Sequence, residues 1–233
     1  DRVSQRRSLR IETLEDRRVL ATIPVLNANP DGPDSLRAAI ESANSTPQAD
    51  EIVFSSFFNT PRTISLVNTQ LTISKSVTII GPGASNLTIA AYNPDDATDG
   101  MGDGDGARVF EVVGDGVSTT EVVISGVTIQ GGDVTGDGGG ILVNDATITI
   151  QNTSISGSHS HGGMDSDGGG IAVFNSSLTL EDSSVSGNSA ESKGGGIYAW
   201  YSDVVIQESC VVASNTVGVG LESTGEGGGV YFY

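Results

Sequence analysis

Cysteine, proline and basic side chains are scarce in this chain of 233 residues. The single cysteine, Cys210, excludes a framework of internal disulfides. The 7 prolines and the lack of a strict three-residue glycine period exclude the collagen and polyproline classes. The 32 glycines instead suit tight turns, because only glycine adopts a positive φ at little energetic cost. The composition therefore favours a turn-rich folded protein.

Basic residues are concentrated at one end of the chain. Residues 1–20 contain six arginines and four acidic residues, whereas the rest of the chain contains 5 basic and 25 acidic residues. A body with this charge repels nucleic acid and anionic membranes, and it favours divalent cations or basic partners. The sequence therefore predicts no nucleic-acid partner. It also contains no apolar run long enough for a transmembrane helix.

A short glycine-rich phrase occurs four times. Three glycines and one Ile or Val occupy residues 138–141, 168–171, 194–197 and 227–230, at intervals of 30, 26 and 33 residues. Each repeat has about three short alternating apolar segments and no helical stretch that could return the chain. A period of this size with such segments predicts an all-β solenoid, a parallel β-helix with three short strands per turn.

The alternation after each phrase predicts columns of stacked side chains. Two columns are expected to face inward: Ile141, Ile171, Ile197 and Val230, then Val143, Val173, Ala199 and Phe232. Two are expected to face outward: Leu142, Ala172, Tyr198 and Tyr231, then Asn144, Phe174, Trp200 and Tyr233. Cys210 aligns with Thr153 and Ser183, which predicts a small residue in a column rather than a reactive thiol.

The chain divides into three parts. Residues 1–22 are basic and lie outside the repeat, so we expect a disordered leader; a short amphipathic helix is the alternative. Residues 23–60 form an N-terminal cap, with an amphipathic helix over about residues 33–44 that covers the open strand edges of the first turn. Residues 52–233 form the solenoid. Because the sequence stops partway through a repeat, we expect a fragment of a longer protein with further C-terminal domains.

Three segments resemble known bacterial sequences. Residues 14–21 resemble the export-associated Leu-Glu-x-Arg-x-Leu-Leu motif of large surface and secreted proteins of planctomycete-like bacteria. Residues 31–44, followed by the strand at 51–54, resemble the Ser-Leu-Arg-x-Ala-Ile cap that precedes many bacterial surface β-helices. From about residue 107, the repeats resemble polymorphic outer-membrane-protein repeats, and residues 185–190 leading to 194–198 match best. These resemblances imply a right-handed β-helix exported to the cell surface or beyond, often in adhesion or autotransport, and they do not imply an enzyme.

Charged residues suggest two metal sites. Asp137, Asp167, Lys193 and Glu226 precede the four phrases and should stack, and a column of carboxylates favours a cation. Calcium is the candidate cofactor because it prefers carboxylate and carbonyl oxygens, and it should raise the melting temperature. The alternative is that the acidic, glycine-rich segments are solvated turns that bind no metal. The candidate calcium ligands are Asp99, Asp103, Asp105, Asp137, Asp165 and Asp167. His159 and His161 could join Asp165 and Asp167 in a zinc cluster, but we expect them to lie in an exposed loop.

Aromatic residues suggest a ligand-binding face. We expect Phe174, Tyr198, Trp200, Tyr231 and Tyr233 to lie on the outer surface, where rings on a rigid rod suit stacking against sugars or insertion into a partner. Two alternatives are a self-stacked ladder of rings and a surface covered by a further repeat.

The sequence thus predicts an extracellular or cell-surface module with a structural or adhesive role, and its partner would be a polysaccharide or a cell-surface molecule. One alternative is a polysaccharide lyase or glycoside hydrolase on a pectin-lyase-like β-helix, for which Lys193, Asp167 and Glu226 are the candidate catalytic residues. A further alternative is the passive stalk of a larger surface protein. The fold alone does not decide among them.

Overall fold

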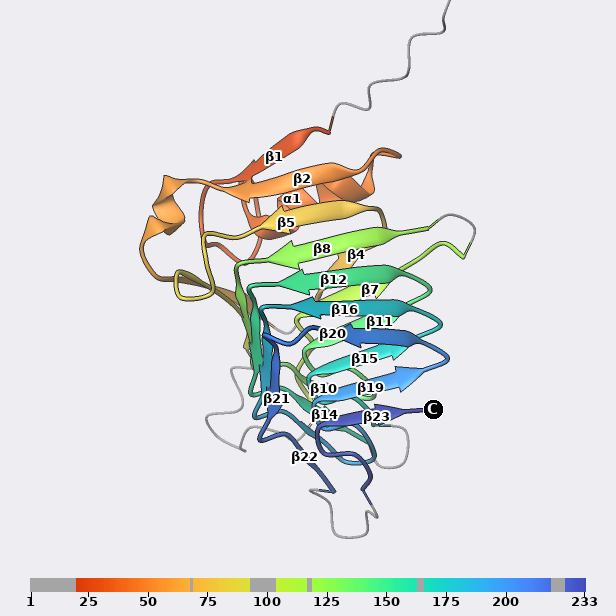
Figure 1. Cartoon of the computed structure of the whole chain (residues 1–233). Coiled ribbons are helices and arrows are strands. Elements are labelled where there is room, and N and C mark those ends of the chain that lie inside the picture. Colours follow the sequence, from red (N-terminus) through yellow and green to blue (C-terminus); the bar gives the residue numbers. More distant parts are fainter. Residues whose placement is uncertain (1–19, 68, 93–103, 117–118, 163–165, 219–224) are drawn as a thin grey trace, which may run out of the picture.

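The computed structural model describes residues 20–67, 69–92, 104–116, 119–162, 166–218 and 225–233. Within these ranges the chain winds into a solenoid of parallel strands, with one α-helix near its N-terminal end (Figure 1). Successive turns stack along one axis, so segments about 30 residues apart in the sequence lie side by side.

The strands form four parallel sheets. Sheet A contains β1 (Thr22–Val25), β2 (Asp50–Phe54), β5 (Val77–Ile80), β8 (Glu121–Ser125), β12 (Thr147–Gln151), β16 (Ser177–Glu181) and β20 (Asp203–Ile206). Sheet B contains β3 (Arg62–Val67), β6 (Leu87–Tyr92), β9 (Thr128–Gln130), β13 (Ser154–Ser156), β17 (Ser184–Ser186) and β21 (Val211–Ala213). Sheet C contains β4 (Leu71–Ile73), β7 (Phe110–Val113), β11 (Ile141–Asn144), β15 (Ile171–Phe174), β19 (Ile197–Trp200) and β23 (Val230–Phe232). Sheet D contains β10 (Asp133–Thr135), β14 (His159–His161), β18 (Ser189–Ala190) and β22 (Thr216–Val217).

Sheets A, B and C supply the three strands per turn that the repeat predicts. Sheet D adds a fourth strand of only two or three residues to the later turns. The sequence analysis did not distinguish these short strands from loops, because their residues are mostly polar. Sheet D places the histidines of β14 in a regular register with the neighbouring turns.

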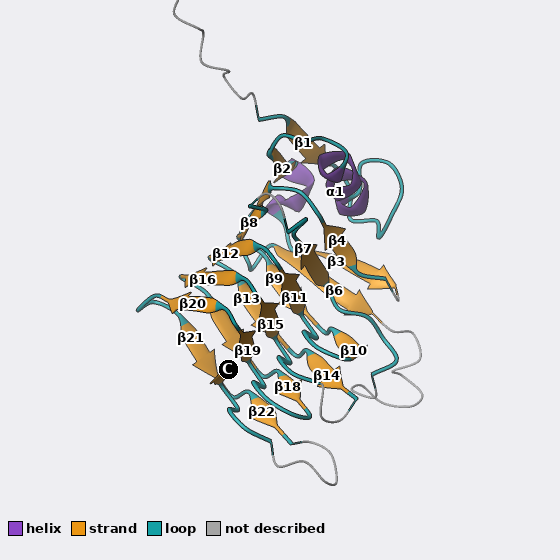
Figure 2. Cartoon of the chain, turned by 90° about the vertical axis from the view of Figure 1, so that its right-hand side faces the viewer, coloured by secondary structure: helices purple, strands orange, loops and turns teal. Residues whose placement is uncertain are grey.

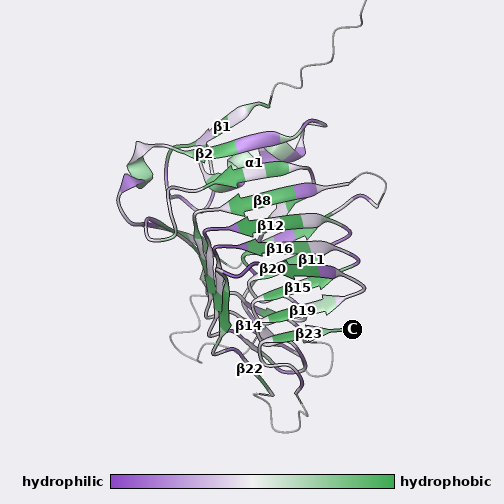
Figure 3. Cartoon of the chain, in the orientation of Figure 1, coloured by the Kyte–Doolittle hydropathy of each residue, from purple (hydrophilic) through white to green (hydrophobic). Residues whose placement is uncertain are grey.

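The predicted columns are present. Strand register pairs Ile171 with Ile141 and Ile197, and these three side chains are fully buried. Figure 3 shows apolar residues concentrated on the strands, where they form one continuous core. The prediction of a buried Phe232 is wrong: its side chain is 58% exposed. It occupies the inward register position, but β23 is the outermost strand of sheet C and no described turn packs over it.

The glycine phrases pack the turns tightly as well as bending the chain. A Cβ on Gly168, whose φ is +69°, would lie 2.4 Å from the carbonyl oxygen of Ile171 and 2.8 Å from the Cβ of Ala172. This close approach covers the outer face of sheet C near the start of each strand. Ala172 and Tyr198 occupy the predicted outward register positions, but both are buried, so the prediction that Tyr198 lies exposed on the outer surface is wrong.

An asparagine ladder lies inside the solenoid at the corner between sheets B and D. The fully buried Asn188 accepts a hydrogen bond from the backbone N–H of Ser158 (3.0 Å) and donates one to the carbonyl of Ile155 (3.1 Å). Its own backbone N–H donates to Asn215 Oδ1 (3.0 Å). The ladder therefore satisfies the backbone N–H groups of Ser158 and Asn188 at this turn.

Helix α1 (Leu36–Asn44) begins later than predicted. Asp34 has a left-handed φ of 62°, which is incompatible with an α-helix at that residue. Ser35 is the N-cap, and its side chain accepts a hydrogen bond from the Ala38 N–H. The predicted apolar face (Leu36, Ala39, Ile40 and Ala43) is buried.

The helix covers the first strand of sheet C (Figure 2). Asn44, its last residue, donates to the carbonyl of Thr72 on β4 (2.8 Å) and accepts from the N–H of Ser74 (2.8 Å). Arg37 donates to the carbonyl of Gln70, just before β4 (2.8 Å). Strand β4 is an edge strand of sheet C, and edge strands expose backbone groups that can pair with other chains. The hydrogen bonds from α1 hold the helix over this edge, as expected for a capping helix.

Candidate functional site

The predicted aromatic residues form stacked pairs between turns. Trp200 and Tyr233 lie with ring centroids 3.9 Å apart and planes 4° from parallel. Tyr198 and Tyr231 stack at 5.8 Å and 8°. Because the partners belong to successive turns, each ring turns a face toward its neighbour along the solenoid axis. These pairs have the geometry of the self-stacked ladder.

Tyr198 is only 3% exposed and lies 5.6 Å from the ring of Phe174. A ligand on the outer surface would therefore meet Phe174, Trp200, Tyr231 and Tyr233 before it could reach this tyrosine. The structure brings all five predicted residues together on sheet C and its C-terminal edge, but with one of them covered.

The charged residues that precede the glycine phrases stack as predicted. Backbone hydrogen bonds join Gly138 to Asp167, Gly168 to Lys193 and Gly194 to Glu226 in successive turns. Asp137 Oδ1 accepts the backbone N–H of Asp167 (2.8 Å). The ammonium of Lys193 lies 5.3 Å from the ring centroid of Tyr231. Among the described ion pairs within 4.0 Å, none joins Lys193 to either Asp167 or Glu226.

Asp167 is the most perturbed acid of this column. Its side chain is 7% exposed, and Oδ1 has no hydrogen-bond partner among the described residues. Burial raises the pKa of Asp167, although Ser192, Lys193 and Tyr198 act in the opposite direction. Burial also raises the pKa of Tyr198, and the nearby Asp167 carboxylate adds to this effect. The Asp167 carboxyl group is therefore protonated more readily than that of an exposed aspartate.

The calcium prediction remains untested, and three of its six candidate ligands lie outside the described residues. Asp99, Asp103 and Asp165 lie outside the described residues. Asp105 is exposed, whereas Asp137 and Asp167 belong to the column above. Across the described ranges, no group of three or more His, Cys, Asp or Glu side chains is arranged to hold a metal ion.

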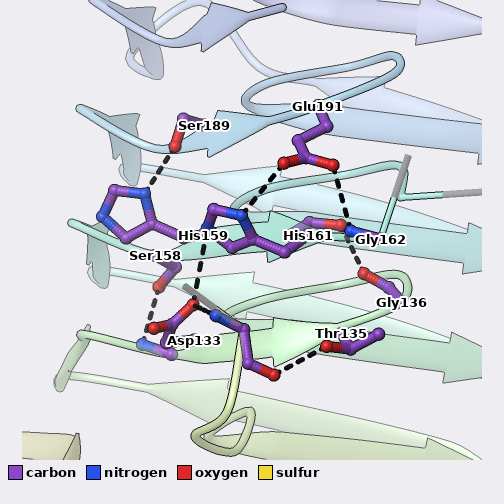
Figure 4. Close-up of polar contacts among 12 residues, drawn as sticks. Asp133, Thr135, Gly136, Ser158, His159, His161, Gly162, Ser189 and Glu191 are labelled. Atoms are coloured by element: carbon purple, nitrogen blue, oxygen red, sulfur yellow. Dashed lines mark hydrogen bonds and ion pairs between the residues drawn. The ribbon is translucent and has the colours of Figure 1, made fainter. Parts of the chain in front are cut away.

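The two histidines lie on β14, so the prediction of an exposed loop is wrong (Figure 4). His161 Nδ1 lies 3.3 Å from Glu191 Oε1, and its Nε2 lies 3.6 Å from Asp133 Oδ1. Glu191 also accepts the N–H of Gly162 (3.1 Å), and Asp133 accepts that of Gly104 (3.1 Å). The imidazole of His161 thus lies between two carboxylates, each of which also binds a backbone N–H. This arrangement indicates a structural role for His161.

An open hollow lies elsewhere, at the corner where sheet C passes into sheet A. We call it the corner groove. Its volume is about 590 Å³, and it is lined by Gly116, Thr119, Asp145, Ala146, Thr147, Asn175, Ser176, Ser177, Tyr201 and Asp203. Three successive turns contribute matching positions to it, which gives two rows of side chains along the axis: Asp145, Asn175 and Tyr201 in the first, Thr147, Ser177 and Asp203 in the second.

The polar groups in the corner groove are free to bind. The side chains of Asp145, Asn175, Thr147, Ser177 and Asp203, and the hydroxyl of Tyr201, make no hydrogen bond or ion pair with any described residue. The floor between the rows is satisfied internally, because Ser176 Oγ accepts the N–H of Ala146 (3.1 Å) and Ser202 Oγ accepts that of Ser176 (3.0 Å). The groove therefore combines solvent-accessible hydrogen-bonding groups with an aromatic side chain, and in ligand pockets these two kinds of contact hold and orient the ligand.

Tyr201 is the unusual residue of the corner groove. Its φ is 44°, and the equivalent residues of the preceding turns, Asn175 (49°) and Asp145 (52°), share this left-handed conformation. Asn and Asp tolerate it, but a bulky residue does so only at a cost. The Tyr201 ring is 69% exposed and stands at 88° to Trp200 and 84° to Tyr233. The Tyr201 ring is therefore perpendicular to the rings of the self-stacked ladder, which it contacts edge-on, and most of its surface faces solvent.

Tyr201 was not among the ligand residues predicted from the sequence, and the rest of the groove was not predicted either. One signal was available. The residue after each sheet C strand, followed by a small residue and then a polar one, recurs as residues 145–147, 175–177 and 201–203. This pattern indicates a conserved turn geometry with variable side chains at its surface.

The stacked parallel strands and the axis-parallel groove at one corner define a β-helix. Residues 111–231, more than half of the chain, match the family model described as a right-handed β-helix region. The chain belongs to this right-handed β-helix family, and its solenoid is right-handed as the repeats implied.

Among solved structures, ORF18 of Geobacillus virus E2 is similar over 83% of this chain, with 14% sequence identity and a TM-score of 0.42. The chain spans about two fifths of that viral protein, since the match covers 40% of it. No curated protein matches the chain. No helix in the described ranges is both long and apolar enough to cross a membrane.

Proposed function

We propose that this chain is a carbohydrate-binding β-helix module of an exported protein, and that the corner groove is its binding site. The observation that carries the proposal is Tyr201, an exposed aromatic ring in a strained backbone conformation at the rim of a polar groove. Strained residues persist where the surrounding structure enforces them, and they often lie at ligand sites.

The lining of the groove supports a sugar ligand. Carboxylates, an amide and hydroxyls accept and donate hydrogen bonds as sugar hydroxyls require. An aromatic face complements the apolar face of a sugar ring. The self-stacked pairs of Trp200 with Tyr233 and of Tyr198 with Tyr231 then act as a rigid support beside the site, because they hold the adjoining turns together.

The basic side chains support binding rather than a lyase reaction. A lyase needs a free base near the substrate. Arg108 donates to Gln70 Oε1 (2.9 Å) and to the carbonyl of Asp137 (3.1 Å). Lys75 lies 3.9 Å from Asp115, and Lys193 lies over Tyr231. Each of these cations is engaged by its own neighbours.

Export and a surface location are parts of the same proposal. The resemblance of residues 14–21 to an export motif supports them, as does the acidic body, which suits a hydrated polymer better than nucleic acid. An adhesive role follows if the ligand is a cell-wall or matrix polysaccharide.

Affinity electrophoresis on a panel of soluble polysaccharides tests the proposal. The wild-type chain should be retarded by at least one of them, and Tyr201→Ala should weaken that binding by about tenfold, the usual effect of truncating an aromatic anchor. Phe57→Ala is the matched control, since Phe57 is also an exposed aromatic residue but lies on the short 3₁₀ helix Ser56–Asn59. Retardation by no polysaccharide would refute the function. Equal binding by wild type and Tyr201→Ala would refute the site.

A further inference from the structure

We propose that the corner groove takes an uncharged polysaccharide chain lying parallel to the solenoid axis and rejects chains of uronic acids. This inference rests on the proposed function and names its substrate class. A pectin-lyase-like scaffold would instead suggest an acidic polysaccharide as the ligand.

The charge of the groove carries the inference. Asp145 stands near one end and Asp203 near the other, and no basic side chain is among the residues that line it. Neither carboxylate has an ion-pair partner among the described residues. A uronate in the groove would therefore meet like charges with no counter-charge from its lining.

The surroundings do not compensate for this charge. Residues 21–233 contain 25 acidic and 5 basic residues. Lys75 reaches the neighbourhood through Asp115, the residue before Gly116, but at 3.9 Å it is already shared with that carboxylate. Like charges that face one another across an interface weaken binding. The groove should therefore discriminate against an anionic chain.

The spacing of the rows suits an extended chain. Asp145, Asn175 and Tyr201 follow one another at the turn spacing of about 4.8 Å. This is close to the advance of one sugar unit along an extended β-linked glycan. An uncharged chain could present hydroxyls to each turn in succession, with one ring packed on Tyr201. Asp145 and Asp203 would then accept hydrogen bonds from hydroxyls instead of repelling carboxylates.

Isothermal titration with a mannan or xyloglucan oligosaccharide and an oligogalacturonate tests the inference. The wild type should bind a neutral oligosaccharide, and it should bind the uronate at least about tenfold more weakly at low salt, with or without calcium. The double variant Asp145→Asn/Asp203→Asn should narrow this gap by about tenfold. Asp182→Asn is the control, because Asp182 is an exposed left-handed aspartate at another corner.

Salt provides an independent readout. Raising the ionic strength to about 1 M shortens the screening length to about 3 Å. In the wild type this should also reduce the difference in affinity between the neutral oligosaccharide and the oligogalacturonate. Uronate binding by the wild type as tight as neutral binding would overturn the inference, and so would a gap that neither the double variant nor salt changes. The proposed function would still stand in both cases if Tyr201→Ala weakened binding. Binding of neither oligosaccharide, nor of any polysaccharide in the wider panel, would instead refute the proposed function.

Discussion

Replacing Tyr201 with Asn should separate binding from stability. Asn is the residue at the equivalent position one turn earlier, where Asn175 has nearly the same φ (49° against 44°). The variant therefore keeps the turn and removes the ring. We expect binding to fall by about tenfold while the free energy of unfolding stays the same or rises.

The magnitude follows from two opposing contributions. A bulky residue in the left-handed region costs about 1–2 kcal/mol, and Asn relieves much of this cost. The Tyr201 ring makes edge contacts with Trp200 at 5.3 Å and Tyr233 at 6.2 Å. Because the ring is 69% exposed, each contact contributes about 0.5 kcal/mol, the low end of the range for aromatic pairs. The net change should thus lie between about 0 and 1 kcal/mol in favour of the variant.

Urea unfolding followed by circular dichroism measures this change, provided that the m-value is the same for both proteins. The reciprocal variant Asn175→Tyr puts a tyrosine into the left-handed conformation one turn earlier and should lose about 1–2 kcal/mol. If Tyr201→Asn lost more than about 1 kcal/mol, Tyr201 would be a packing residue, and the argument from strain to function would fail.

Three further variants test other parts of the structure. Asn188→Ala leaves the buried N–H of Ser158 without its side-chain acceptor and removes one hydrogen bond to the carbonyl of Ile155, so it should lose about 1–3 kcal/mol in urea unfolding. A loss no larger than that of the exposed control Asn152→Gly would contradict the ladder. Asp167→Asn should flatten the dependence of melting temperature on pH. Because burial raises the pKa of Asp167, its contribution to stability is present below the unfolded pKa of about 3.9 and is lost as pH rises through the folded pKa. The variant should therefore gain on the wild type toward neutral pH, and parallel melting curves would contradict this. Asn44→Ala removes two bonds from α1 to sheet C and should lose about 1 kcal/mol, with the exposed Glu41→Gln as control. Equal stability of these two variants would mean that Asn44 does not hold the helix to the sheet.

Much of the fold could be predicted from the sequence because alternation and stacking are local patterns. Ile141, Ile171 and Ile197 recur at the same place after each glycine phrase, and the structure pairs them in register. The burial of Phe232 was mispredicted because alternation gives a direction, whereas burial also needs a neighbour on each side.

The outer surface was harder to predict. Tyr198 points outward by alternation, yet the turn of the glycine phrase lies close against that face. How closely two segments approach depends on backbone conformation far from the residue concerned, and a pattern of apolar residues does not encode it.

The corner groove could not be predicted from strand patterns at all. Asp145, Asn175 and Tyr201 differ in size, charge and polarity, so no search for like residues would align them. What they share is a left-handed backbone conformation at the same corner. The aromatic pattern of the sequence points to the strands of sheet C, whereas Tyr201, at the corner next to them, lies perpendicular to the stacked rings and is mostly exposed.

The left-handed corner also bears on how such a protein could diversify. The side chain at that corner contributes little to the core, since the buried columns and the serine floor hold each turn. Residues there could be exchanged one turn at a time with little change in register. Duplicating a whole turn would lengthen the groove by one unit of about 4.8 Å and leave its cross-section unchanged. A solenoid with more turns would then bind longer polymers through more contacts of the same kind. Its avidity would increase with the number of turns, while its specificity for a particular sugar stayed the same.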